Sequence, residues 1–318
     1  MTEAWTIQRL LLWTRDWLGQ KGVQSPRVDA ELMLGHVLGL RRLDLLLRFD
    51  QSVSPEELAR FKAMIQRRAR SEPVAYILGT KGFYSIDVLV TPAVLVPRPE
   101  TEVLVDRLLA FLKSPEAPEG PVLDLCTGSG AIVLAAAHEL RTPPKPQRKP
   151  NLDLDAPPSV PQVQAQAPLA WTRAFWATDL SDEALTVARK NADVLGIPVA
   201  FLQGDLFAPL PAGQRFAAIV TNPPYIRSDV MPTLPRDVLG FEPYLALDGG
   251  PQGMVVLARI AEQAAHFLLP GGLLAIELGS RDQGAAVVAL LADHGLPGAS
   301  VEQIQSGPTC AVLVNKSL

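Results

Sequence analysis

The sequence predicts an α/β fold, with a small all-α N-terminal domain, a linking β-hairpin and a domain built on a mainly parallel seven-stranded sheet. Three features of the chain lead to this prediction. Helix signals fill the first 72 residues, β-branched and aromatic residues follow over 80–97, and short apolar strands alternate with helices from residue 121 onward. Such alternation is typical of a parallel sheet covered by helices.

The composition is that of a globular protein. The chain has 318 residues, of which 48% are hydrophobic and 19% charged, and it is long enough for two domains. It contains no apolar run near the ~20 residues of a membrane span and no secretory signal, so we expect a cytoplasmic protein. Cys126 and Cys310 lack paired spacing, which predicts no disulfide, and the four scattered histidines predict no metal site.

The charge is unevenly distributed. The net charge of −4 divides into +3 over residues 1–80 and −7 over the remainder. Because nucleic-acid binding normally shows as a basic patch, this charge favours a protein or small-molecule substrate without excluding a nucleic-acid one. We expect a monomer with no direct contact to nucleic acid or to a membrane.

The N-terminal domain, residues 1–72, carries helix start signals. Ser25 before Pro26 has the pattern of an N-cap followed by a first-turn proline. Ser54 and Glu57 have the pattern of a capping box. Helices are therefore expected over residues 3–20, 26–38 and 55–70.

Residues 73–98 are expected to link this domain to the next one through the hairpin. Their β-forming residues fall into two runs separated by Thr91-Pro92, which predicts the turn at that point. A helix over 103–112 follows. Glu100 and Glu102 lie at its start, where acidic residues ordinarily complement the helix dipole.

The sheet domain, residues 99–318, is predicted from its alternation of strands and helices. Strands are expected over 122–125, 175–178, 199–202, 216–220, 273–278, 300–305 and 310–314. Helices are expected over 131–140, 182–195, 252–268 and 283–293. Ser181 should cap the second of these helices, Pro270-Gly271-Gly272 should turn into the fifth strand, and the last two strands should form an antiparallel hairpin at the sheet edge.

A proline-rich stretch at about 141–170 interrupts this alternation of strands and helices. Eight of the 29 prolines fall within 141–168, with almost no aromatic or β-branched residues. Such a segment cannot bury enough apolar surface to offset its ordering entropy. We interpret it as a flexible surface insertion, and a proline-rich docking ligand is the alternative.

Candidate ligand-binding residues follow three successive strands. The loop Cys126-Thr127-Gly128-Ser129-Gly130 lets the backbone and a helix N-terminus approach a ligand, although Gly-x-Gly alone is weak evidence. Asp179 can accept hydrogen bonds from both hydroxyls of a ribose. Asp205 can accept from an adenine amino group, with Leu206 packing on the ring. Each acid alone is more often a helix cap or a solvated loop residue.

The strand over 216–220 ends at Asn222-Pro223-Pro224-Tyr225. Neither proline donates a backbone N–H, and each disfavours helix in the residue before it, so Asn222 is held in a stiff turn. This turn lies at the carboxyl end of a strand, where open α/β sheets bind their ligands. A simple strand-terminating turn is the alternative interpretation.

Together these motifs resemble the Rossmann-like class I S-adenosylmethionine (SAM) methyltransferases. In that class, Asn-Pro-Pro-Tyr is similar to the motif of enzymes that methylate amide-like or exocyclic nitrogens. The resemblance implies that the Asn222 side-chain oxygen and the Pro223 carbonyl accept the two N–H bonds of the target nitrogen, and that Tyr225 packs against the planar group. Positioning of this kind needs no general base before methyl transfer.

Leu95 to Glu102, the Asn222 turn and Phe241-Glu242-Pro243 together resemble the HemK/PrmC family. These are glutamine-N5 methyltransferases of class I peptide-chain release factors, acting on the Gly-Gly-Gln loop. The resemblance implies an N-terminal domain that binds the release factor and S-adenosylhomocysteine as product. It also implies two sets of site residues. SAM would contact Cys126, Thr127, Gly128, Ser129, Gly130, Asp179, Asp205, Leu206 and Asn222, and the glutamine would lie on Asn222, Pro223, Pro224 and Tyr225.

The chain departs from the family pattern at Cys126, often glycine, in the proline-rich insertion, and at the C-terminal Ser306-Gly307-Pro308. Three alternative functions are compatible with some of these sequence motifs. A nucleic-acid adenine-N6 or guanine-N2 methyltransferase should add a basic, aromatic-rich recognition region, and a ribosomal-protein glutamine methyltransferase typically has Ser-Pro where Pro99 is followed by Glu100. A non-enzymatic SAM-binding protein would have no use for the Asn222 turn.

Overall fold

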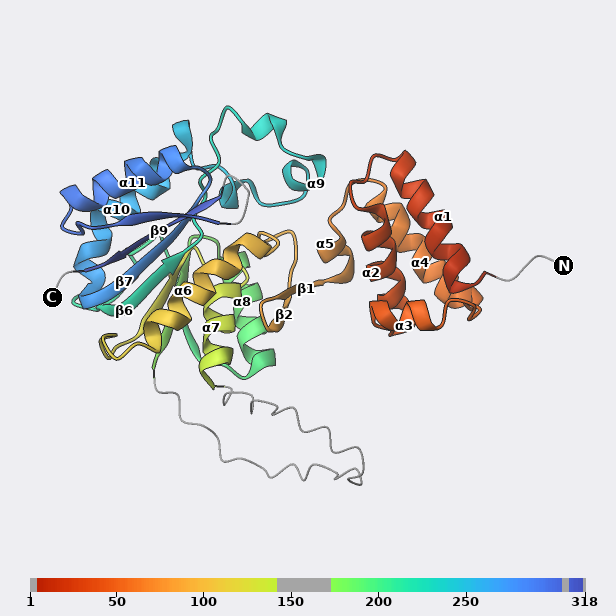
Figure 1. Cartoon of the computed structure of the whole chain (residues 1–318), viewed down its shortest axis with the longest axis horizontal. Helices are drawn as coiled ribbons and strands as arrows, with labels where there is room; N and C mark the ends of the chain where they lie inside the picture. The colour runs from red at the N-terminus through yellow and green to blue at the C-terminus, as the bar shows by residue number, and fades with distance from the viewer. Residues whose placement is uncertain (1–4, 142–172, 305–308, 317–318) are drawn as a thin grey trace, which may run out of the picture.

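The computed structural model describes residues 5–141, 173–304 and 309–316. It has two lobes, a helical N-terminal lobe and a larger lobe in which helices cover both faces of a sheet (Figure 1). The proline-rich stretch, apart from its first residue, lies outside the described residues, as do Ser306 to Pro308.

The N-terminal lobe contains five helices within the described residues, two more than expected. They are α1 (Ile7–Gln20), α2 (Pro26–Leu38), α3 (Arg42–Leu47), α4 (Pro55–Arg68) and α5 (Val74–Leu78). The predicted capping box is present, because Ser54 Oγ accepts from the Glu57 N–H at 3.2 Å while Glu57 Oε2 accepts from the Ser54 N–H at 2.8 Å. Ser25 is the N-cap residue of α2 and Pro26 its first residue, as predicted, but the Ser25 side chain does not act as a cap. Ser25 has a ψ of 54° instead of the extended value near 160° at Ser54, and its side chain makes no cap hydrogen bond.

The larger lobe contains the predicted seven-stranded sheet, in the order β5-β4-β3-β6-β7-β9-β8. The first five of these strands run parallel, and β9 is antiparallel to both β7 and β8, as expected for a closing hairpin. The strands are β3 (Val122–Leu125), β4 (Phe175–Asp179), β5 (Val199–Gln203), β6 (Phe216–Thr221), β7 (Leu268–Leu278), β8 (Ser300–Gln303) and β9 (Cys310–Asn315).

Alternate strand residues face two separate helix layers. On one face, Val220 and Ala275 belong to the core that includes α6, α7 and α8. On the other, Ile219 and Ile276 belong to the core that includes α10 and α11. These helices are α6 (Glu102–Leu112), α7 (Ala131–Arg141), α8 (Asp182–Leu195), α10 (Val255–Phe267) and α11 (Arg281–Asp293), and short helical turns occur at α9 (Arg236–Leu239), η1 (Pro99–Thr101), η2 (Met231–Thr233), η3 (Tyr244–Ala246) and η4 (Pro251–Gly253). Ser181 caps α8 as predicted, accepting from the Ala184 N–H at 3.1 Å.

The linking hairpin consists of β1 (Thr80–Phe83) and β2 (Ile86–Leu89). Its turn lies at Tyr84 and Ser85, so the prediction of a turn at Thr91-Pro92 is wrong. Thr91 does begin a turn, closed by the Val94 N–H on the Thr91 carbonyl at 3.0 Å, but that turn leads the chain away after β2 has ended. The sequence could not distinguish these turns, because the true one depends on a left-handed Tyr84 (φ 53°) that bulky residues rarely adopt.

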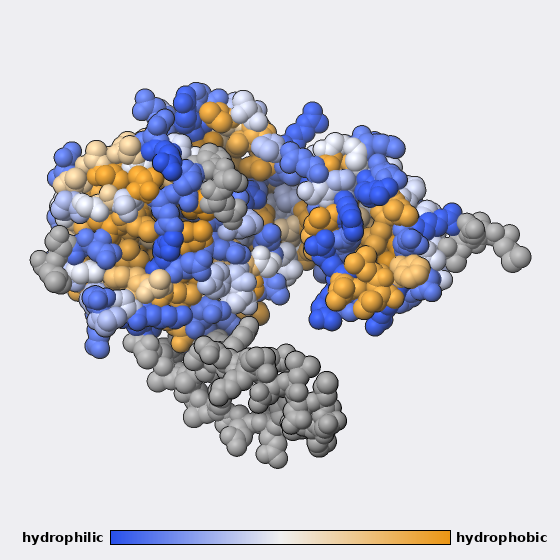
Figure 2. All heavy atoms as spheres, viewed as in Figure 1, coloured by the Kyte–Doolittle hydropathy of each residue, from blue (hydrophilic) through white to orange (hydrophobic). Residues whose placement is uncertain are grey.

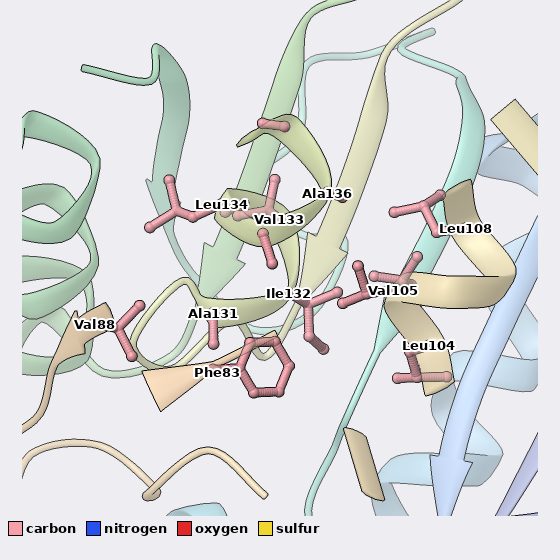
Figure 3. Close-up of a cluster of buried hydrophobic side chains, with 14 of the residues drawn as sticks. Phe83, Val88, Leu104, Val105, Leu108, Ala131, Ile132, Val133, Leu134 and Ala136 are labelled. Atoms are coloured by element: carbon pink, nitrogen blue, oxygen red, sulfur yellow. The ribbon is translucent and has the colours of Figure 1, made fainter. Parts of the chain in front are cut away.

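The hairpin is packed onto the sheet domain near the expected ligand site. Figure 3 shows Phe83 and Val88 beside the apolar side chains at the start of α7, and they share one buried core with residues of α6. Asn191 of α8 connects the hairpin to the glycine-rich loop. Its side chain accepts from the Leu89 N–H at 2.7 Å and donates to the Ser129 carbonyl at 2.9 Å. The hairpin therefore braces the glycine-rich loop.

The strand β7 begins five residues earlier than predicted, and Pro270-Gly271-Gly272 lies inside it. Pairing with β6 shifts from Phe216–Leu268 to Ala218–Leu273, which is a bulge. The bulge absorbs the extra residues, and hydrogen bonds of Gly271 and Gly272 with Lys316, each at 2.9 Å, hold the segment in the sheet.

Candidate active site

The glycine-rich loop follows β3 and turns sharply into α7. Cys126, Gly128 and Gly130 all have positive φ angles, of 56°, 55° and 81°. Glycine adopts this conformation without strain, whereas Cys126 does so at a steric cost. Burial raises the pKa of the Cys126 thiol, so it stays protonated at neutral pH.

Asp124, a residue that the sequence analysis left without a role, ties this loop to α7. Its fully buried carboxylate accepts from the Thr127 hydroxyl at 2.7 Å and from the Val133 N–H at 3.3 Å. Burial raises the pKa of Asp124 to about 7. The carboxylate thus organises the loop from behind instead of facing a ligand.

Asp179 lies at the end of β4 beside the loop. Its two carboxylate oxygens accept from the backbone N–H groups of Gly128 and Ser181, each at 2.9 Å. Burial raises the pKa of Asp179, and the two N–H bonds partly offset that increase. Each oxygen keeps a lone pair, so the carboxylate can still accept from a ribose.

Asp205 and Leu206 follow β5. Leu206 is buried with a φ of 51°, and its carbonyl accepts from the Thr178 hydroxyl at 3.1 Å. Asp205 is paired with Arg259 of α10 at 2.7 Å, a contact that the sequence did not predict. Both partners are nearly half exposed, so the pair stabilises the fold little and can open for a ligand.

A cavity of about 520 Å³ lies between these strand ends and the hairpin exit. It is within the usual size range of small-molecule sites. Of the nine residues expected to contact SAM, eight line it: Cys126, Thr127, Gly128, Ser129, Asp179, Asp205, Leu206 and Asn222. Gly130 does not. A Cβ atom there would lie 3.0 Å from Leu134, so this glycine serves the close packing of the loop on its own helix.

Asn222 follows β6 and reaches the same cavity. Its side-chain amide donates to the hydroxyl of Thr101 at 3.0 Å. Thr101 is 4% exposed and ends η1, directly before α6. With the amide nitrogen bound in this way, the Asn222 side-chain oxygen is left as an acceptor at the cavity.

The other three residues of the Asn222 turn differ in whether they reach the cavity. Pro224 lines the cavity, whereas Pro223 and Tyr225 are not among its lining residues, and Pro223 is buried. The Tyr225 hydroxyl donates to Glu277 Oε1 at 3.0 Å, and its ring lies close to Gly279, where a Cβ atom would come within 3.0 Å of Tyr225 Cδ2. Burial raises the pKa of the Tyr225 hydroxyl, which therefore stays protonated and donates.

Arg98 and Glu242 join the segment before η1 to the segment after α9. The Arg98 guanidinium lies 2.5 Å from Glu242 Oε1, and the Val96 N–H approaches the other oxygen at 3.4 Å. Burial raises the pKa of Glu242, an increase that Arg98 opposes. This pair braces two walls of the cavity, because Pro97 and Pro243 beside it both line it.

The site residues that the sequence analysis missed or left without a role are Asp124, Thr101, Glu277, Glu242 and Arg259. Thr101 and Asn222 are 121 positions apart, so no local spacing could pair them. The available signals were two charged residues within apolar strands, Asp124 and Glu277.

In the part of the chain that the structure describes, no helix is long and apolar enough to cross a membrane. Within the same residues, no three His, Cys, Asp or Glu side chains gather as they would around a metal ion.

Two family models match the chain. The PrmC N-terminal domain matches residues 9–79, and the RMKL-like methyltransferase domain matches residues 110–229. Among solved structures, a methyltransferase from Pyrococcus furiosus covers 80% of this chain and 99% of its own at 17% identity, with a TM-score of 0.49, which is too low to support a conclusion.

Sequence similarity to curated proteins is closer and covers most of the chain. A release factor glutamine methyltransferase from Geobacter sulfurreducens is 39% identical over 87% of this chain and 85% of its own length. One from Moorella thermoacetica is 42% identical over 85% and 84%. Identity at this level over most of both chains shows that the chain belongs to the release factor glutamine methyltransferase family.

Proposed function

We propose that this chain transfers a methyl group from SAM to the side-chain amide nitrogen (N5) of the glutamine in the Gly-Gly-Gln loop of class I peptide-chain release factors. S-adenosylhomocysteine is the second product, and the modification supports translation termination. The observation that carries the proposal is the Asn222 amide, whose nitrogen is bound to Thr101 and whose oxygen is left as an acceptor at the cavity.

The residues of the cavity fit the methyl donor. SAM combines a ribose, an adenine and a charged amino-acid end, and when bound it supplies an activated methyl group. Asp179 would accept from the ribose hydroxyls, and Asp205 with Leu206 would hold the adenine. The N-terminus of α7 and the backbone N–H groups of residues 126–130 would face the carboxylate of the amino-acid end. Of these groups, Asp179 is already held in place by two backbone N–H donors.

Asn222 would position the acceptor nitrogen. The nitrogen of a glutamine side chain is a poor nucleophile because its lone pair is delocalised. When its two N–H bonds are accepted by the Asn222 oxygen and the Pro223 carbonyl, the lone pair turns toward the methyl group. The proton leaves after transfer, so the chain needs no base at this position. Tyr225 would flank the planar amide.

The release factor is expected to contact both lobes, with the N-terminal lobe as its second point of attachment. We propose that the enzyme acts as a monomer on this protein substrate and needs no direct contact with nucleic acid.

The test is methyl transfer from labelled SAM to a purified class I release factor, beside a version with the loop glutamine changed to alanine. Label on the first and not on the second supports both the reaction and the acceptor. Label on ribosomal protein, rRNA or DNA instead would keep the Asn222 chemistry and reject the release factor as substrate.

The first mutational prediction concerns Asn222. The Asn222→Ala variant should bind SAM with nearly unchanged affinity and lose on the order of 100-fold or more in kcat, because it removes an acceptor that acts on the reacting nitrogen. Calorimetry with SAM and single-turnover methylation measure the two effects. Asn315→Ala is the matched control, since Asn315 pairs with Leu273 at the opposite end of the sheet. Near-normal turnover of Asn222→Ala would reject the assigned role.

A further inference from the structure

Glu277 lies next to Asn222 because of the sheet register. The last pair between β6 and β7 is Thr221 with Ile276, and the strands are parallel. The next residue on each strand is therefore Asn222 and Glu277 respectively. Glu277 is 1% exposed and does not line the cavity, so its carboxylate lies behind the Asn222 turn.

Two hydroxyl groups approach this buried carboxylate. The Tyr225 hydroxyl donates to Oε1 at 3.0 Å. The Thr101 side chain also lies close enough to the carboxylate to lower the pKa of Glu277. Oε2 has no hydrogen-bond partner among the described residues, so it can accept the proton of a neighbouring hydroxyl. Leaving a buried oxygen incompletely satisfied costs stability, which favours a functional reason for it.

The Thr101 hydroxyl connects Glu277 to Asn222. A hydroxyl has one proton to donate, and an ionised carboxylate can only accept. With its proton directed at Glu277, the Thr101 oxygen can only accept from Asn222. The Asn222 amide must then point its nitrogen at Thr101, as observed at 3.0 Å. A flipped amide would place two oxygens against each other and present N–H groups to the substrate nitrogen.

We propose that Glu277 and Thr101 are positioning residues for methyl transfer, which lock the side-chain amide of Asn222 in the orientation that accepts from the substrate. This role rests on the proposed function. It is distinct from the role of Asn222 itself, because neither Glu277 nor Thr101 donates to or accepts from the substrate.

The test compares variants that change single hydrogen bonds at nearly constant volume. Thr101→Val removes the hydroxyl, Thr101→Ser keeps it, and Glu277→Gln replaces the obligate acceptor by an amide that can donate. Thr14→Val is the matched control. Thr14 is also fully buried, but it lies in α1 of the other lobe and its hydroxyl has no hydrogen-bond partner among the described residues.

We expect Thr101→Val and Glu277→Gln each to lower kcat, by up to about 100-fold, as misplacement of a reacting group by about 1 Å can do. The KM for the release factor and the affinity for SAM should stay within about twofold. Thr101→Ser should restore turnover, and Thr14→Val should match the wild type. A role in packing alone would instead lower the melting temperature and SAM affinity together with kcat.

The pH profile of kcat supplies a second readout. The groups facing Glu277 are the hydroxyls of Tyr225 and Thr101, the Glu100 carboxylate and the Arg98 guanidinium. Burial is the main cause that raises the pKa of Glu277, to about 7. Protonated Glu277 can donate a hydrogen bond to the Thr101 oxygen. The Thr101 proton is then free to turn toward Asn222, and the orientation of the Asn222 amide is no longer fixed. Wild-type kcat should therefore fall as the pH drops below about 7, and Glu277→Gln should be slow with no such inflection.

Wild-type transfer to the intact release factor tests the proposed function by itself. Against that background, normal turnover of Thr101→Val or of Glu277→Gln would overturn the positioning role alone. A wild-type kcat that stays flat between pH 6 and 8 would also count against it.

Discussion

Two carboxylates next to the site, Asp124 and Glu277, are buried with one oxygen lacking a hydrogen-bond partner among the described residues. Burial of a charged group without full compensation favours its neutral form. Both carboxylates have a pKa raised to about 7, mainly by this desolvation. Their placement sacrifices folding stability at high pH in order to hold the cofactor loop and the Asn222 turn.

The pH dependence of stability follows from these shifts. A carboxylate whose pKa is raised on folding binds more protons when folded, so the free energy of unfolding falls as pH rises. The fall should begin near pH 4, the ordinary range for these acids, and level off above about 7. Each group contributes on the order of a few kcal/mol. Urea unfolding at intervals from pH 5 to 8 measures the slope.

Glu277→Gln is the diagnostic variant for this slope. It removes one of the buried carboxylates whose pKa is raised, so its stability should decline less steeply than that of the wild type between pH 5 and 7. Equal slopes for the two proteins would mean that Glu277 titrates near its ordinary pKa. The same variant also serves the kinetic test above, which allows both measurements on one preparation.

At the scale of the element, helix starts show what local sequence can and cannot predict. The start of α4 is set by contacts within four residues, and its capping box was correctly predicted. The start of α2 was also placed correctly, although the Ser25 side chain makes no cap bond there. Local patterns thus locate a helix end more reliably than they identify the group that stabilises it.

This difference gives a matched stability test. Ser54→Ala should lower the free energy of unfolding by about 1 kcal/mol, because the Glu57 N–H loses its acceptor at the helix start. Ser25→Ala should change it by only a few tenths of that amount, since no cap bond is lost. Thermal unfolding of the two variants beside the wild type gives the comparison. Equal losses would show that Ser25 caps α2 in solution.

The short elements were beyond local prediction. α3 has six residues and α5 has five, which is too few for helical periodicity to appear, and tertiary contacts hold both. Arg42 at the start of α3 binds buried Glu31 at 2.5 Å, and Tyr76 of α5 donates to the Val94 carbonyl at 2.5 Å. The residues of the site likewise fall into those that the local sequence predicts and those that it does not. Strand-end residues of the cavity were predicted, whereas Thr101 and Glu277 act through partners more than 50 positions away.

At the scale of the whole molecule, the two lobes are connected by the hairpin and by an ion cluster around the buried Arg68 side chain. Arg68 at the end of α4 binds Asp29 at 2.7 Å and reaches Asp237 of α9 at 3.4 Å. The Arg68 side chain is 9% exposed. Burial raises the pKa of Asp29, an increase that Arg68 opposes. The N-terminal lobe is therefore anchored to the segment that continues to Glu242 and the cavity wall.

The N-terminal lobe leaves an apolar surface uncovered. Leu43, Leu46, Leu47 and Phe49 are 62%, 54%, 72% and 52% exposed, and we call these four residues the α3 patch. Figure 2 shows apolar side chains gathered on the lower part of this lobe, where Figure 1 places α3. A contiguous exposed apolar patch is typical of a protein-binding surface. The lobe matches the PrmC N-terminal domain, so we expect the release factor to occupy this surface.

Leu47→Glu tests this expectation. A charge at the centre of an apolar contact should raise the KM for the release factor by about tenfold or more, since burying an unpaired carboxylate costs well over 1.4 kcal/mol. The kcat at saturating release factor and the affinity for SAM should not change, because the α3 patch belongs to the other lobe. Val194→Glu is the control, since Val194 is equally exposed at 75% but lies on α8. If both variants kept the wild-type KM, the release factor would have to be held by the catalytic lobe alone, and the apolar α3 patch would need another occupant.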